Sequence, residues 1–237
     1  MLGLRASFLV RRHEPYENPM AQVFHPSTNT IAKVTSWAAV FLIALLAWVG
    51  VSLDRSSYST GQGIVRTQPV QFSHDHHTAG LGIDCRYCHD TVETSAFAGM
   101  PPTQTCYGCH QQIWAQSPFL EPVRESFRTG QPIRWVRVHD LPDFTYFNHA
   151  IHVAKGVGCA TCHGPVERMQ LIYQYPSLKM KWCVDCHRDP EPHLRPASEI
   201  YNTTYVAADQ AVIGAALASA NRVRDPFTLT SCSTCHR

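Results

Sequence analysis

The chain carries the string C-x-x-C-H five times, and these strings contain all ten of its cysteines. They read CRYCH at 85–89, CYGCH at 106–110, CATCH at 159–163, CVDCH at 183–187 and CSTCH at 232–236. Two thiols at this spacing can add to the two vinyl groups of haem, and the adjacent histidine then lies under the iron as an axial ligand. The sequence therefore predicts five covalently attached haem c groups.

The predicted site residues follow directly from the five strings. The haem-attachment residues are Cys85, Cys88, Cys106, Cys109, Cys159, Cys162, Cys183, Cys186, Cys232 and Cys235, and the proximal iron ligands are His89, His110, His163, His187 and His236. A zinc site has no need for a histidine directly after the second cysteine. A thioredoxin-like dithiol would be single and would follow a strand. No cysteine remains for a disulfide framework.

A second motif, F-x-H-x-x-H, precedes two of the haem strings. It reads FSHDHH at 72–77 and FNHAIH at 147–152, so the chain repeats one unit over 72–110 and 147–187. The fifth string, at 232–236, lacks this upstream motif. Histidines three apart share a helical face but cannot both reach one iron, so each pair should serve two haems. The predicted distal ligands are His74, His77, His149 and His152, whereas we interpret His76 as facing solvent or a haem propionate.

Five irons require one more distal ligand. The candidates are His139, His193, Met100, Met169 and Met180. Met180 lies three residues before Cys183, and a thioether ligand would raise that haem's potential relative to bis-histidine neighbours. Met180 and His139 are the two preferred candidates. His13 and His25 precede the apolar segment described next, and so fall on its other side.

Residues 34–53 form an uncharged apolar run of twenty residues. A helix of this length is about 30 Å long, the thickness of a bilayer's hydrocarbon core. The run is longer than a signal-peptide core and lacks a clear cleavage site, which favours an uncleaved anchor. Arg5, Arg11, Arg12 and Lys33 precede it. We therefore expect a cytoplasmic segment 1–33, a transmembrane anchor 34–53 and a periplasmic haem domain 56–237 in the cytoplasmic (inner) membrane.

The composition limits partners and fold. A net charge of +2 with no long basic run argues against nucleic acid. We predict a mostly α and irregular fold with a haem-dominated core, plus one N-terminal transmembrane helix. Helices are expected at 117–129, with Ser117 as cap, Pro118 in the first turn and Gly130 at the end, and at 206–223. Segments 56–71 and 188–205 should be extended loops, and no strand pattern is strong.

The paired motifs over residues 72–187 resemble the class III multihaem cytochromes. A closer resemblance covers PIRWVRVHDLPDFTYFNHAIHVAKGVGCATCHGPVERM and LKMKWCVDCHRDPEP. With five haem strings and one anchor, the chain resembles the pentahaem membrane-anchored cytochrome c subunit of alternative complex III. That resemblance implies a quinol:electron-acceptor oxidoreductase. It implies as partners a polytopic quinol-binding subunit, an iron–sulfur subunit, and a monohaem cytochrome c or terminal oxidase as acceptor.

These observations favour an electron-transfer subunit over a catalyst, with no catalytic residue assigned. Multihaem reductases keep one iron open for substrate, whereas the surplus of histidines and methionines here leaves none necessarily open. Two alternatives stay open at this stage. The chain could be a self-standing membrane-anchored quinol dehydrogenase, or less readily a multihaem reductase.

Overall fold

The computed structural model describes residues 24–236, and these fall into two compact units divided between residues 51 and 52. Each unit is described on its own. Most of the expected cytoplasmic segment, including Arg5, Arg11, Arg12 and His13, lies outside the described residues.

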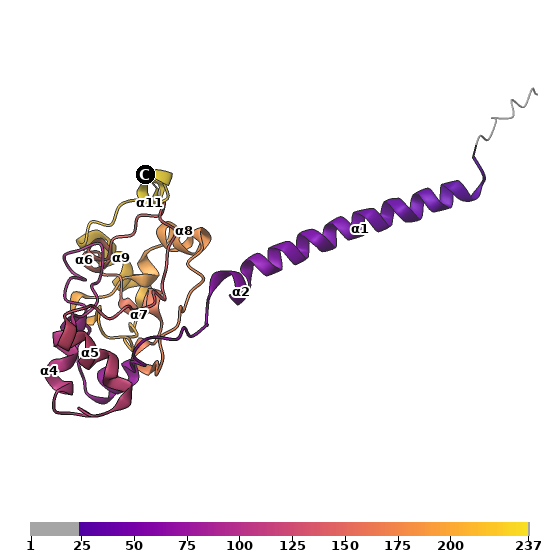
Figure 1. Cartoon of the computed structure of the whole chain (residues 1–237). Coiled ribbons are helices and arrows are strands. Elements are labelled where there is room, and N and C mark those ends of the chain that lie inside the picture. The colour runs from indigo at the N-terminus through magenta and orange to yellow at the C-terminus, as the bar shows by residue number, and fades with distance from the viewer. Residues whose placement is uncertain (1–23, 237) are drawn as a thin grey trace, which may run out of the picture. The chain divides into compact units, whose positions relative to one another are not determined.

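Within the described residues, the first unit is mainly the helix α1 (Ser27–Arg55; Figure 1), and residues 52–55 of this helix belong to the second unit. None of its side chains is buried. Among residues 24–236, α1 is the one helix long and apolar enough to cross a membrane. It starts before the predicted span 34–53 and ends after it, because no proline or glycine interrupts the chain between Ser27 and Trp48 and nothing breaks the helix before Arg55. The expected apolar N-terminal helix is therefore present.

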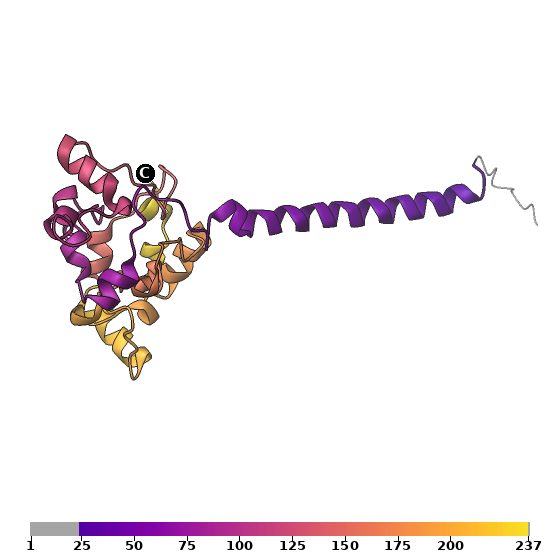
Figure 2. The same ribbon diagram turned by 60° about the horizontal axis from the view of Figure 1, so that its bottom comes forward.

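The second unit is built from short helices joined by long irregular segments (Figures 1 and 2). Its α-helices are α2 (Ser57–Thr60), α3 (Cys85–Cys88), α4 (Thr103–His110), α5 (Glu121–Thr129), α6 (His149–Ala154), α7 (Cys159–His163), α8 (Met180–Arg188), α9 (Gln210–Ala220), α10 (Pro226–Leu229) and α11 (Cys232–Cys235). Tighter or wider helical turns occur at η1 (Asp75–Gly80), η2 (Pro118–Leu120), η3 (Val166–Arg168), η4 (Glu191–His193) and η5 (Ala197–Glu199). The described residues contain isolated bridges, such as Gln62 with Gln174, but no strand. The mostly helical and irregular prediction is confirmed.

The helix predicted at 117–129 is present but begins differently. Pro118–Leu120 form a 3-10 turn, and α5 follows to Gly130, whose φ of 71° ends it in the left-handed region. Ser117 is extended, but its side chain makes no capping hydrogen bond. Ser117 therefore stands at the predicted N-cap position, but the capping hydrogen bond expected from its side chain was wrong.

The helix predicted at 206–223 is shorter than expected. It runs from Gln210 to Ala220, because Asp209 is extended and its carboxylate accepts a hydrogen bond from the Val212 amide at 3.2 Å. The loop predicted at 56–71 contains the short helix α2, and the loop at 188–205 contains η4 and η5. Both segments are otherwise irregular, as predicted.

The polypeptide buries few apolar side chains of its own. Among the described residues, the buried hydrophobics are Val70, Val92, Leu120, Val123, Val138, Met169, Leu194 and Ile200. Val70, Leu120 and Val123 form a small cluster that packs on Cys106 and Tyr107 of α4. A unit of this length normally buries a larger apolar core. The apolar core that the described residues form is therefore small.

Candidate haem-attachment sites

The two cysteines of each C-x-x-C-H string lie on a short helix. The two cysteines are three residues apart, so their thiols lie on one helical face. The residue before each of α3, α4, α7, α8 and α11 has an extended backbone, which starts each helix at or just before its motif. All ten cysteines are free thiols. The local structure therefore presents two thiols per motif to one adjacent group.

Burial favours the neutral forms of the two thiols and the histidine of the third motif. Burial raises the pKa of the Cys159 thiol to about 11 and, with the charge of Cys186, that of Cys162 to about 12. Burial also lowers the pKa of the His163 ring to about 3, with help from the charge of His139. A neutral imidazole keeps a nitrogen lone pair, which is the form that binds a metal. The third motif is thus partly buried, and its His163 ring is in the neutral form that can bind a metal.

Hydrogen bonds fix the tautomer of most of the predicted ligands. Nine histidines are predicted ligands within the C-x-x-C-H and F-x-H-x-x-H motifs, and in seven of them Nδ1 lies within hydrogen-bond distance of a backbone carbonyl. A carbonyl oxygen only accepts, so Nδ1 carries the proton and Nε2 keeps its lone pair. The bonds run from His77 to Ser73 (2.8 Å), His89 to Gly99 (2.7 Å), His110 to Ile113 (3.0 Å), His149 to Ala96 (2.8 Å), His152 to Asn148 (2.7 Å), His187 to Leu229 (2.9 Å) and His236 to Phe144 (3.1 Å).

Three of these histidines from the upstream motifs face three from the C-x-x-C-H motifs. A bond from a metal to an imidazole nitrogen is about 2.0 Å long, so two rings on opposite sides of one metal have centres roughly 6 Å apart. The ring centres are 6.2 Å apart for His77 and His110, 6.3 Å for His149 and His163, and 6.1 Å for His152 and His187. These separations fit one iron between the rings of each pair.

His74 belongs with the first motif. Burial and the charge of His89 lower the pKa of the His74 ring to about 4, and its Nδ1 is buried without a protein partner. Phe72 stacks on His77 with ring centres 4.3 Å apart and meets His74 edge-on at 4.9 Å. Phe147 makes the same contacts with His152 at 4.5 Å and with His149 at 4.7 Å. The phenylalanine of each F-x-H-x-x-H motif therefore fixes both rings, a role that spacing alone did not reveal.

His76 takes no part in these pairs. It is exposed, and its ring stacks on Trp114 with centres 6.3 Å apart. This position agrees with the solvent-facing half of its interpretation.

The candidates for the fifth distal ligand are spread over the unit. His139 lies 4.4 Å from His163 between ring centres, too close for one metal to fit between them, and its Nε2 is buried without a protein partner. Met180 is 70% exposed at the start of α8, Met100 is exposed, and Met169 is buried. The ring of Phe144 lies beside that of His236, with ring centres 5.8 Å apart. The ring separations thus pair three motif histidines, His110, His163 and His187, with upstream histidines, and within the described residues they give His236 no partner from the candidate set.

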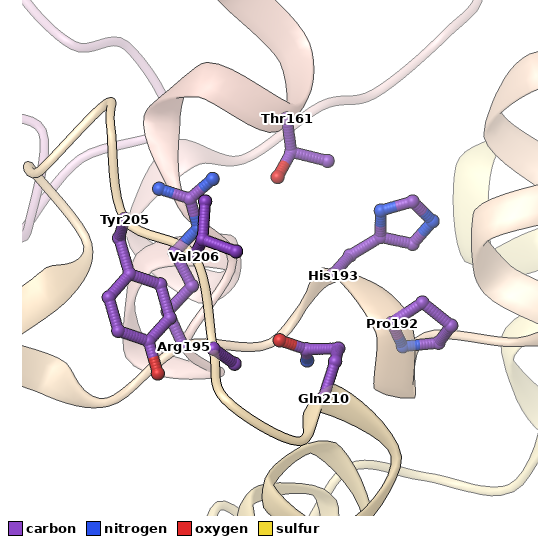
Figure 3. Close-up of a pocket in the computed structure, with 8 residues that line it drawn as sticks. Thr161, Pro192, His193, Arg195, Tyr205, Val206 and Gln210 are labelled. Carbon is purple, nitrogen blue, oxygen red and sulfur yellow. The ribbon is translucent and has the colours of Figure 1, made fainter.

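His193 lines a cavity of about 290 Å³ beside α7 (Figure 3). Thr161, Arg195, Tyr205 and Gln210 also line it. The Arg195 guanidinium donates to the Asn202 carbonyl at 2.6 Å, and its side chain covers Gly158 so closely that a Cβ there would lie 2.4 Å from Nε. Arg195 therefore holds the start of α7 in place. No motif or spacing in the sequence marked Arg195.

One comparison with known proteins found a similar multihaem cytochrome c subunit. No protein-family model matches the chain. The chain is similar to the "Menaquinone reductase, multiheme cytochrome c subunit" of Nitratidesulfovibrio vulgaris, with 30% identity over 150 residues. The match covers 54% of this chain and 71% of that relative. The chain therefore belongs to the family of that multihaem cytochrome c subunit.

Proposed function

We propose that the chain is the electron-transfer subunit of a membrane quinone oxidoreductase complex and that it carries five haem c groups. The observation that carries this proposal is the set of three histidine pairs with ring centres 6.1–6.3 Å apart. Haem c, when bound, supplies a one-electron iron couple. Two histidines would hold the iron at each of these three sites, and this would leave no free coordination position there for a substrate. This arrangement favours electron transfer over a reductase.

Different residues attach each haem covalently and bind its iron. In each motif the two cysteines anchor the group and the adjacent histidine is the proximal ligand. We assign the distal ligands as His74 opposite His89, His77 opposite His110, His149 opposite His163 and His152 opposite His187. The carbonyls that accept from Nδ1 hold the rings in the ligating tautomer and make them better donors.

The fifth distal ligand is proposed to be Met180. It shares a helical face with Cys183, three residues on, and burial together with the charge of Cys235 raises the pKa of the Cys183 thiol. The fifth motif therefore lies beside this face of α8. His139 is the weaker choice, because its ring lies against His163.

The proposed membrane topology follows the order of segments along the chain. α1 anchors the protein in the inner membrane, with 1–33 cytoplasmic and the haem domain 56–237 periplasmic. Units 72–110 and 147–187 each hold two haems, and 232–236 holds the fifth.

We propose that the complex is of the alternative complex III type. Its partners would be a polytopic quinol-oxidising subunit, an iron–sulfur subunit, and a monohaem cytochrome c or terminal oxidase. The relative's name describes a complex that reduces menaquinone, and the resemblance to alternative complex III implies quinol oxidation. A chain of haems carries electrons in either direction, because the potentials of its partners set the direction. We assign the quinol-oxidising direction on the resemblance.

Purification from native membranes tests the proposal. The chain should co-purify with a polytopic membrane protein, and the complex should reduce its haems with a quinol analogue. The isolated chain should be reduced by dithionite but not by the quinol analogue. Reduction of the isolated chain by quinol would overturn the subunit assignment and favour a self-standing quinol dehydrogenase.

A further inference from the structure

The five motifs do not follow one another in space as they do in sequence. The contacts between their supporting segments define a different order. This order deepens the proposed function and rests on it, since it matters only when all five motifs carry haem.

The second motif adjoins the first. The single ring of Phe72 contacts His77, which faces His110 of the second motif, and also His74, which belongs with the first.

The first motif adjoins the third. The loop after the first motif holds the start of α6: the amides of His149 and Ala150 donate to the carbonyls of Ala96 and Ser95 at 3.2 and 3.1 Å. His149 Nδ1 donates to Ala96 as well, at 2.8 Å, and the same ring faces His163 of the third motif.

The third motif adjoins the fourth in the same way as the first adjoins the second. The ring of Phe147 contacts both His149 and His152, which face His163 and His187 respectively. The two halves of the repeat therefore have the same internal arrangement. They join through the first and third motifs, which are the leading motifs of the two units.

The fifth motif adjoins the fourth. His187 Nδ1 donates to the carbonyl of Leu229 in α10 at 2.9 Å, and the short connection from α10 leads directly into α11. The Tyr146 amide donates to the Cys235 carbonyl at 2.8 Å, which ties the fifth motif to the segment leading into Phe147.

We infer that the five haem-attachment motifs follow one another in space in the order second, first, third, fourth, fifth. The second and fifth motifs are then the two ends of the series, where electrons pass to or from partners. In this order the first motif of the sequence is an internal relay rather than an end of the series.

Two measurements on the purified, haem-loaded protein test this order. Anomalous scattering at the iron edge from crystals gives the iron positions, each assigned by the motif that holds it. The motif-1 iron should lie between those of motifs 2 and 3, and the motif-2 and motif-5 irons should be farthest apart. Five irons with the motif-2 iron between those of motifs 1 and 3 would overturn the order and leave the proposed function intact. Fewer than five irons would overturn the proposed function instead.

A matched pair of ligand substitutions gives an independent readout. His74→Met and His77→Met should each raise the potential of one haem, since a methionine ligand favours the reduced iron. Reduction of that haem removes a positive charge and lowers the potentials of its neighbours. Redox titration followed by electron paramagnetic resonance should detect two shifted neighbours in His74→Met and one in His77→Met. Two shifted neighbours in His77→Met and one in His74→Met would contradict the order.

Discussion

The neighbouring histidines His76 and His77 offer a matched test of the axial-ligand assignment. His77 faces His110 with ring centres 6.2 Å apart and donates from Nδ1 to Ser73, whereas His76 is exposed and stacks on Trp114. His77→Ala should leave one of five irons without its distal ligand, so about one fifth of the haem should become high-spin. His76→Ala should leave all haems low-spin.

Low-temperature electron paramagnetic resonance, normalised to total haem, measures the high-spin fraction. Added imidazole should enter the vacated seat in His77→Ala and restore the low-spin signal, which a misfolded protein would not do. Equal high-spin fractions in the two variants would refute the pairing of His77 with His110. A high-spin fraction that imidazole does not reverse would refute it as well.

Three further predictions concern the scaffold and the anchor. Gly164 has φ 68° and ψ −158°, and a Cβ there would lie 2.4 Å from the Tyr175 ring, so Gly164→Ala should lower the free energy of unfolding by about 3 kcal/mol. Gly108 lies in α4, and a Cβ there would have no atom within 4 Å, so Gly108→Ala should leave the free energy of unfolding unchanged or raise it by about 0.5–1 kcal/mol. Equal urea midpoints for the two variants would contradict this prediction. The Tyr201 hydroxyl donates to the Glu93 carboxylate at 2.7 Å, and the Arg86 guanidinium lies over the Tyr201 ring. Tyr201→Phe should therefore lower the free energy of unfolding by about 1 kcal/mol, and Tyr201→Ala should lower it by more. An unchanged denaturant midpoint for Tyr201→Phe would show that the hydrogen bond contributes nothing to stability. The full chain should stay in the membrane pellet after alkaline carbonate washing because of α1, and its release would argue against a spanning anchor.

Local features of this protein were readable from the sequence because their causes are local. The spacing of two cysteines and a histidine depends on one helical turn, and Gly130 ends α5 through its own φ. The start of α9 was misjudged because Asp209 caps the helix later than the apolar run suggested.

Features that depend on contacts between distant segments were not readable. The Nδ1 bonds from His149 to Ala96 and from His187 to Leu229 span 53 and 42 residues, and no spacing rule encodes them. The repeat predicted two ligand pairs per unit but not that the leading motifs of the two units would meet. The fifth distal ligand stayed open in the sequence because a lone methionine or histidine has no pattern around it.

The haem content of the purified protein tests the central claim most directly. A pyridine haemochrome assay against protein concentration should give five haems per chain. All five should remain with the protein after acid–acetone extraction, because thioether bonds do not release haem in acid. Four or fewer haems per chain, or haem extracted into the acetone, would contradict the account.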